Sequence, residues 1–516
     1  MSSLRLSRRA LVTGIAATLL ATTAACGGDA ASPAGSPKSG GTLTIGFDNE
    51  PTTLDPAFSS QISSDRNVLN LFYDSLLRQN RDGAFAPALA EKWAAADKTL
   101  TFTLREGVKF HDGTVFDAAA VKANLDRVLD PATKSTKASA LATVAAVTAV
   151  DAKTVRLDLK QPDPLLLVQL AHEAGMMVSP AALKAKGKDY GRGPVGTGPF
   201  TFDQWRSKVQ LSANRNGSYW AKAADGSALP RLSKVVVRFI TEPKVLRTEL
   251  ATGGVQLVRA LPPEEFTQLD GDKNITMEDT GVRRSYYVAL NTTRAPFNDP
   301  KTRAAFAAAI DRAAIGKVAA AGQFDLAPSF ATKSDWYYDG SLAPAAHDPA
   351  AAKAALTTPV SITVLARRRA PDPSIAELLQ AQLGAVGFTV KSEVLELQTQ
   401  LDRMRKQDFD AAVLVADVPR LDPSLSFDPY FTSTGSNNWS GLKDTQLDGL
   451  LATARGTDDK AARTKAYVDA QRRILAENYW TFLHQAKSPL VRRTALQGVV
   501  LNVDGQWRLD EASLDR

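Results

Sequence analysis

The sequence predicts an α/β protein in which at least one part is built on a parallel sheet. Over residues 359–417, strand-like and helical runs alternate as β-α-β-α-β, the order typical of parallel strands joined by crossover helices. Elsewhere, short runs with alternating apolar residues stand beside longer runs with apolar residues at helical spacing. Residues 27–516 are also numerous enough for two or three domains, each with its own core.

The first 26 residues have the pattern of a bacterial export signal. Basic residues precede an apolar run over residues 11–25, which is too short to span a bilayer. The only cysteine, Cys26, follows two alanines and resembles the lipid-attachment residue of bacterial lipoproteins, with Thr23 where leucine is usual. We therefore predict lipid attachment at Cys26, and a flexible linker over residues 27–40, which are almost all Gly, Ser, Pro and Ala. The paired arginines at positions 8 and 9 leave both the general and the twin-arginine export routes open.

Further elements are expected in order along the chain. Alternating apolar residues predict strands over residues 41–48, 99–105 and 282–293, and helical spacing predicts helices over 64–80, 117–131 and 299–322. Asp112-Gly113 predicts a tight turn. The glycine-rich stretch 192–205 lacks both the dinucleotide and the P-loop patterns, and is interpreted as a turn that leads into a strand.

Composition excludes several classes of protein. The net charge is +7 and no run of five like charges occurs, so nucleic acid is not an expected partner. After Cys26 there is no cysteine, which excludes disulfides and a thiolate nucleophile from the folded part. The four histidines are far apart in sequence, and no Gly-x-Ser-x-Gly or His-Glu-x-x-His motif is present. These patterns give no local signature of a metal site or of an enzyme, although distant residues could still converge, and we expect no metal and no cofactor.

Four blocks resemble the peptide/nickel-type (family 5) extracellular solute-binding proteins of bacterial ABC importers, in particular the dipeptide- and oligopeptide-binding ones. The longest block is LAEKWAAADKTLTFTLREGVKFHDGTVFDAAAVKANLDRVLDP, residues 89–131. The others are PVGTGPF (194–200), the segment from LNTT to AAI (290–315), and NNWSGLKDTQLDGLLATA (437–454). They occur in the order of the family and span most of the chain.

The resemblance implies a two-lobe periplasmic-binding-protein (Venus flytrap) fold with an extra α/β domain inserted in the first lobe. Lobe I would comprise residues 41–74, 190–284 and 491–516, the inserted domain 75–189, and lobe II 285–490. Strands that cross between the lobes near Tyr287 and Lys487 would act as hinges. The implied mechanism is capture of a ligand between the lobes and not enzymatic catalysis, and the permease would recognise the closed lobes.

The resemblance also implies five ligand-binding residues. In peptide-binding relatives an aspartate after the buried strand pairs with the α-amino group of the ligand, and Asp417 matches that position. In dipeptide-type relatives an arginine shortly before a proline binds the ligand carboxylate, and Arg369 resembles it. Trp439, Trp336 and Tyr337 are candidates for the apolar walls of the site.

The function expected from the resemblance is a lipid-anchored, monomeric binding component that captures short peptides and delivers them to an ABC permease. It would lie on the outer face of the cell membrane or in the periplasm. Two alternatives stay open at this point. The same fold binds oligosaccharides or metal chelates in other proteins, and an exported hydrolase with a distant catalytic set is not excluded by residue order.

Overall fold

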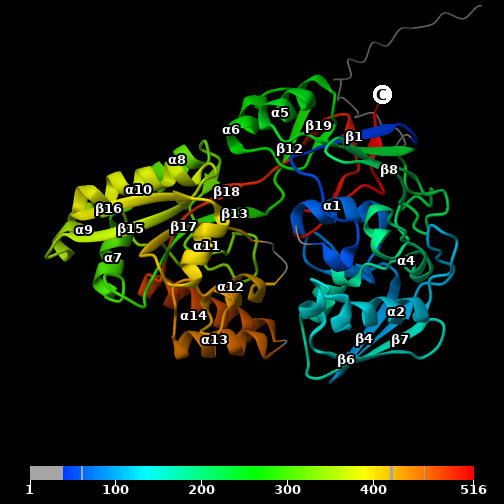
Figure 1. Ribbon diagram of the computed structural model, residues 1–516, viewed down its shortest axis with the longest axis horizontal. Coiled ribbons are helices and arrows are strands. Elements are labelled where there is room, and N and C mark those ends of the chain that lie inside the picture. Colours follow the sequence, from blue (N-terminus) through cyan, green and yellow to red (C-terminus); the bar gives the residue numbers. More distant parts are fainter. Residues whose placement is uncertain (1–38, 60–61, 419–421, 458, 516) are drawn as a thin grey trace, which may run out of the picture. The chain divides into compact units, whose positions relative to one another are not determined.

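Two large sheets, each in one lobe, organise the chain, and a smaller sheet is built from residues 90–159, which are inserted between the first two strands of the lobe I sheet (Figure 1). The computed structural model describes residues 39–59, 62–418, 422–457 and 459–515. The predicted lipid attachment at Cys26 lies outside these residues, as does the predicted export signal. The predicted domain boundaries stay a prediction, and below the two lobes and the inserted domain are defined by their sheets.

The sheet of lobe I has seven strands in the order β12-β19-β11-β1-β10-β9-β8. β1 runs parallel to β10 and β11, and β19 pairs antiparallel with β11 and β12. The chain therefore returns to this sheet near its end, through β19. The strands are β1 (Thr42–Phe47), β8 (Phe200–Arg206), β9 (Gln210–Arg215), β10 (Lys234–Phe239), β11 (Leu257–Val258), β12 (Ile275–Glu278) and β19 (Leu490–Arg493), and the helices are α1 (Ile62–Phe72), α5 (Pro243–Thr252) and α6 (Pro263–Phe266).

The inserted domain has a four-stranded antiparallel sheet in the order β4-β5-β7-β6, covered by α2. Asp117 caps α2 by accepting the N–H of Ala120, as the sequence predicts. Its elements are β2 (Leu77–Gln79), β3 (Phe85–Pro87), β4 (Ala90–Ala96), β5 (Thr99–Leu104), α2 (Ala118–Leu129), β6 (Val144–Ala149), β7 (Thr154–Leu159), α3 (Leu166–Leu170) and α4 (Pro180–Lys186). Short C-terminal pairs belong to lobe I: β20 (Leu496–Gln497) with β23 (Ser513–Leu514), and β21 (Val500–Leu501) with β22 (Trp507–Arg508).

The sheet of lobe II has six strands in the order β14-β18-β13-β17-β15-β16. β15 runs parallel to both β16 and β17, which confirms the parallel arrangement predicted for residues 359–417, while β13 is antiparallel to its two neighbours. The strands are β13 (Arg283–Leu290), β14 (Phe324–Asp325), β15 (Val360–Arg367), β16 (Phe388–Leu395), β17 (Ala411–Val418) and β18 (Trp480–Lys487). The helices are α7 (Pro300–Ala308), α8 (Arg312–Ala319), α9 (Pro349–Ala355), α10 (Asp372–Val386), α11 (Leu397–Arg405), α12 (Ser424–Phe431), α13 (Thr445–Arg455) and α14 (Lys460–Glu477).

The prediction of one helix over residues 299–322 is wrong, because the chain forms two helices there. Asp311 begins the second helix by accepting the N–H of Ala314 at 2.9 Å. The break lets the buried Arg312 side chain donate to three backbone carbonyls, among them that of Phe482 at 2.9 Å. Satisfying a buried guanidinium outweighs helix propensity at this point.

The glycine-rich turn at residues 194–200 is structural. A Cβ atom on Gly196 would lie 2.2 Å from the Phe72 carbonyl oxygen, and one on Gly198 would lie 2.4 Å from the Phe72 carbonyl carbon. The His111 ring holds this turn, since its Nε2 lies 3.0 Å from the Gly198 oxygen and its Nδ1 accepts the Gly196 N–H at 3.3 Å. Two of the family-like blocks therefore serve to join the inserted domain to lobe I.

Candidate ligand-binding site

The carboxyl edge of the lobe II sheet brings together the two charged residues predicted for the site. β15 and β17 are adjacent and parallel, with Val364 opposite Ala411. Asp417 stands at the end of β17, and Arg369 follows the end of β15. Because neighbouring strands lie about 4.8 Å apart, the backbones that carry the two residues end side by side. Ligands of open α/β sheets collect beyond such strand ends.

The three consecutive arginines after β15 have three different environments. Arg367 binds the fully buried Asp372 through Nε at 2.6 Å and through its terminal nitrogen at 3.0 Å. Arg368 is exposed and pairs with the exposed Glu396 at 3.1 Å. Arg369 is exposed and has no ion-pair partner among the described residues. Arg367 therefore fixes the turn, and the predicted role of Arg369 in ligand binding stays a prediction.

Sequence reasoning missed the cations that β13 contributes to the same edge. Arg284 is the backbone partner of Asp417 in the β13–β17 register. Its neighbour Arg283 is largely buried and donates to Asp279 at 2.8 and 2.9 Å and to Asp325 at 3.0 Å. The sequence offered one signal for these cations. Two consecutive arginines stand at the start of the predicted strand 282–293, directly before a run that is almost wholly buried.

The three predicted wall residues lie in the aromatic core of lobe II. Tyr337 is 4% exposed and Trp439 is 8% exposed, so neither presents a wide surface to a ligand in this structure. Trp336 is half-buried, and the Arg463 guanidinium lies 5.2 Å from its ring centre. Arg463 in turn pairs with Asp422 at 2.8 Å, a few residues after Asp417. Of the three, Trp336 retains the most accessible surface.

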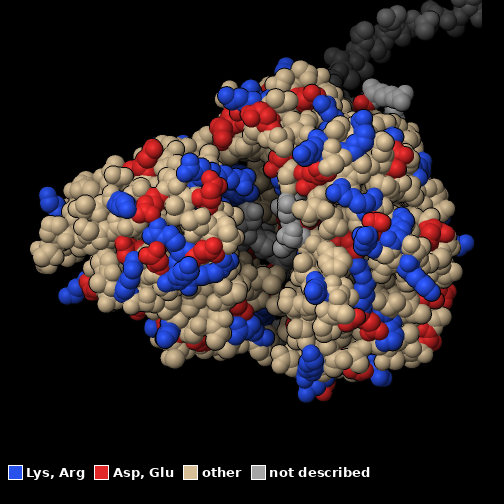
Figure 2. All heavy atoms as spheres, in the orientation of Figure 1, with Lys and Arg blue, Asp and Glu red and all other residues tan. Residues whose placement is uncertain are grey.

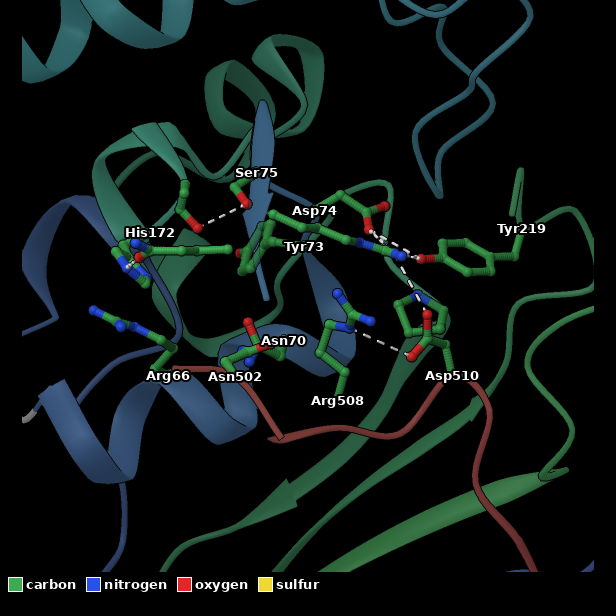
Figure 3. A pocket seen from close by; sticks show the side chains of 14 residues that line it. Arg66, Asn70, Tyr73, Asp74, Ser75, His172, Tyr219, Asn502, Arg508 and Asp510 are labelled. Atoms are coloured by element: carbon green, nitrogen blue, oxygen red, sulfur yellow. Dashed lines mark hydrogen bonds and ion pairs between the residues drawn. The ribbon is translucent and has the colours of Figure 1, made fainter. Parts of the chain in front are cut away.

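Lobe I contains a polar cavity lined by charged side chains (Figure 3). Arg78 reaches both the Asp74 and the Asp510 carboxylates at 3.4 Å and donates to the Tyr219 hydroxyl at 2.9 Å. Arg66 is an ion-pair partner of Glu173. The cavity measures about 30 Å³, room for one or two water molecules, so it is too small for a peptide.

The charges around this cavity are strongly coupled. Burial would raise the pKa of Glu173, but the charge and hydrogen bond of Arg66 outweigh burial and lower the pKa to about 2. Burial, together with the positive charge of Arg66, lowers the pKa of His172 to about 4.

Among the described residues no group of His, Cys, Asp and Glu side chains is arranged to hold a metal ion. On the visible surface, acidic and basic side chains are interspersed (Figure 2).

Comparison with known proteins identifies the family. The family profile of bacterial extracellular solute-binding proteins, family 5 (middle region), matches residues 84–438. The chain belongs to the family 5 solute-binding proteins. It is 32% identical over 478 residues to the glutathione-binding protein GsiB of Escherichia coli (strain K12), with 88% of this chain and 90% of that protein covered.

Solved structures of the family share the fold. The periplasmic binding protein AgaA of Agrobacterium tumefaciens R10, solved with agropinic acid, is 25% identical with a TM-score of 0.75 and covers 92% of this chain and 99% of its own. The Helicobacter pylori protein DppA, solved with the peptide STSA, is 24% identical with a TM-score of 0.77 and covers 93% and 99%. These likenesses confirm the predicted two-lobe α/β fold.

Family membership settles the class of activity. Family 5 members are extracellular solute-binding components of the ABC importer family and not enzymes, which sets aside the exported-hydrolase alternative. The described residues include no helix that is both long enough and apolar enough to cross a membrane. What this chain binds, and how it is held at a membrane, are addressed next as proposals.

Proposed function

We propose that this family 5 protein captures short peptides and delivers them to an ABC permease while a lipid on Cys26 holds it at the outer face of the membrane. The observation that supports the ligand class is the placement of Asp417 and Arg369 at the carboxyl ends of two adjacent parallel strands. A carboxylate and a guanidinium carried by neighbouring strand ends would be complementary to the amino and carboxylate groups of a short zwitterion.

In this proposal Asp417 pairs with the free amino group of the ligand, and Arg369 binds a ligand carboxylate. Arg367 supports Arg369, because its bond to the buried Asp372 fixes the turn that follows β15. Trp336 would form part of the apolar wall, and Tyr337 and Trp439 would back that wall from the aromatic core. Glutathione is the first peptide to test, since a relative with 32% identity is named for binding it.

The first experiment is native mass spectrometry of the purified full chain carrying Cys26→Ala, followed by denaturing release of bound molecules. A short-peptide mass is the expected result. A sugar or metal-chelate mass would contradict the peptide class while leaving the family untouched. The protein is expected to run as a monomer in the same spectrum.

Calorimetric titration then tests the two charged residues. With glutathione or the released peptide as ligand, Asp417→Ala should weaken binding by about 2–4 kcal/mol, since a desolvated ammonium loses its partner. Arg369→Ala should weaken binding of the free acid but not of the matching C-terminal amide. Asp402→Ala, which removes an exposed carboxylate from α11, is the matched control and should leave affinity unchanged. Equal affinities for Asp417→Ala and wild type would remove Asp417 from the site.

Membrane attachment is tested separately. Wild-type precursor should fractionate with membranes and incorporate a labelled fatty acid, whereas Cys26→Ala should do neither. Membrane association that persists in the Cys26→Ala protein would contradict lipid anchoring without touching the ligand proposal.

A further inference from the structure

The chain passes between the two sheets twice in the described residues, and both passages are short. Residues 279–282 lead from β12 in lobe I to β13 in lobe II, and residues 488–489 lead from β18 back to β19. The first passage lies before Tyr287, which is 1% exposed inside lobe II. The Thr280 hydroxyl donates to the Ser488 carbonyl at 2.8 Å, so the two passages are joined to each other.

Gly281 is the residue of the first passage with the freest backbone. Its φ of +78° lies in the region that glycine adopts without strain. The Asp279 carboxylate, however, spans this residue. It accepts the Gly281 N–H at 2.9 Å and two bonds from the Arg283 guanidinium at 2.8 and 2.9 Å. A rotation at Gly281 therefore has to break or redirect charge-assisted hydrogen bonds.

The inserted domain reaches the same passage through Arg81. This residue lies in the loop between β2 and β3, and one terminal nitrogen binds the Glu278 carboxylate at 2.6 Å. Its other terminal nitrogen donates to the backbone carbonyl of Asp279. Arg81 thus contacts the last residue of β12 and the first residue of the passage.

A C-terminal turn of lobe I packs against the passage from another direction. A Cβ atom on Gly505 would lie 2.9 Å from a methyl carbon of Val282 and 3.4 Å from the Cβ of Thr280. Only a residue without a side chain allows this approach. On the lobe II side, Arg283 continues the chain of contacts to Asp325 on β14 at 3.0 Å.

We propose that Arg81 and Asp279 are positioning residues that restrict the passage between the lobes and so set the range of lobe arrangements open to the ligand-free protein. Neither residue belongs to the candidate ligand site. The bonds connect Arg81 of the inserted domain, through Asp279 and Arg283, to β14 of lobe II. Movement of one lobe relative to the other therefore also depends on contacts that lie outside the two passages. The effect on ligand affinity rests on the proposed function, whereas the effect on lobe motion does not.

The restriction predicts a measurable change without any ligand. Cys26 is the only cysteine, so the full chain with Cys26→Ala accepts two dyes at introduced cysteines without background. The exposed residues Ala224 in lobe I and Ala354 on α9 are suitable for A224C and A354C. In single-molecule energy transfer, Arg81→Ala and Asp279→Asn should each broaden the distribution of distances between the dyes.

Matched variants separate positioning from general stability. Arg81→Lys keeps the charge and should restore part of the wild-type distribution. Lys153→Ala removes an exposed ion pair to Glu106 elsewhere in the inserted domain and should leave the distribution unchanged. Urea midpoints of all variants should stay close to wild type, because the pairs that are removed are partly exposed.

Glutathione binding is the second readout. Flexibility gained in the free protein has to be lost on closure, so the Kd should rise about threefold to tenfold in Arg81→Ala and Asp279→Asn. Distance distributions of both variants that coincide with that of Lys153→Ala would overturn the proposal. If wild type does not bind glutathione, the proposed ligand fails, and the dye distances alone decide this inference.

Discussion

Each lobe has an apolar core, and each also holds one distinctive buried cluster. In lobe I, Arg66 joins Glu173 of the inserted domain to Asp504 of the C-terminal segment, and all three side chains are buried. In lobe II, Tyr287 stacks on Trp480 with ring centres 3.9 Å apart, inside a cluster of aromatic side chains. The Arg66 network depends on partners for desolvated charges, and the aromatic cluster depends on packed area.

The difference between the Arg66 network and the aromatic cluster predicts how strongly a substitution in each one lowers stability. A buried charge that loses its partner carries its full desolvation cost, whereas an aromatic core can collapse in part around a smaller residue. Segments far apart in sequence meet in the lobe I network, so that network joins three stretches of chain by a few bonds. Lobe II spreads its stabilisation over many ring contacts. The following four predictions test this contrast.

The largest effect is expected from Arg66→Ala. The change leaves two buried carboxylates without a cation and should lower the free energy of unfolding by about 4–5 kcal/mol. Urea denaturation gives the magnitude, and hydrogen exchange should show lost protection in α1 and around residue 173 but not in lobe II. A loss below 1 kcal/mol would mean that the network is hydrated and that the contrast between the lobes is overstated.

Trp480→Ala tests the other interior. Trp480 is 2% exposed, and its removal leaves a cavity beside Tyr287 and Phe431, so unfolding should cost about 3–4 kcal/mol less. Hydrogen exchange should show lost protection of backbone amides in lobe II only. Trp480→Phe keeps most of the packed area and should recover at least half of the loss. Exchange that rises equally in both lobes would contradict separate cores.

Acidification should act on one histidine in each lobe. Burial lowers the pKa of His484 to about 4, and burial with the charge of Arg66 does the same for His172. Both values lie below the 6.5 of an exposed histidine, so the unfolded chain takes up protons first as the pH falls. Stability should be complete above pH 6.5 and decline toward pH 4, by roughly 2–3 kcal/mol for each histidine.

His484→Phe and His172→Gln separate the two contributions. His484 stacks on Tyr286 with ring centres 4.9 Å apart, and neither of its ring nitrogens has a hydrogen-bond partner within the part of the chain that the structure describes, so phenylalanine suits its site. Each variant should show a shallower loss of stability between pH 6.5 and 4. Slopes equal to wild type in both variants would show that carboxylates govern the acid response.

The smallest effect is expected at the surface. Lys122 and Asp126 form an exposed pair one helical turn apart on α2, at 2.7 Å. Lys122→Ala should change stability by only about 0.3–0.5 kcal/mol, which sets the scale against which Arg66→Ala is judged. A loss comparable with that of Arg66→Ala would remove burial as the explanation of the difference.

Much of the fold could be predicted from the sequence where local pattern and final packing agree. The strand over 282–293, the capped helix beginning after Asp117 and the turn at Asp112-Gly113 all formed as expected. The helix predicted over 299–322 did not, because two of the three carbonyl partners of Arg312 are distant in sequence. Such partners leave no local signal.

The site was predictable in part for the same reason. The alternation of strands and helices predicted that Asp417 lies at the carboxyl edge of the sheet, whereas Arg369 was predicted from the family resemblance alone. The contribution of Arg284 depends on the pairing of β13 with β17, which joins positions more than a hundred residues apart. The burial of Tyr337 and Trp439 depends on helices α12 and α14, so an aromatic motif alone did not distinguish a wall from a core.

The hydrogen bond between Thr280 and Ser488 has a mechanical consequence. A body attached at one point can swing and twist in any direction, whereas a body attached at two neighbouring points turns about the line that joins them. Because the two connections are themselves fastened to each other, that line keeps its length and place. Rotation of the lobes about this line is therefore the movement that the two connections oppose least.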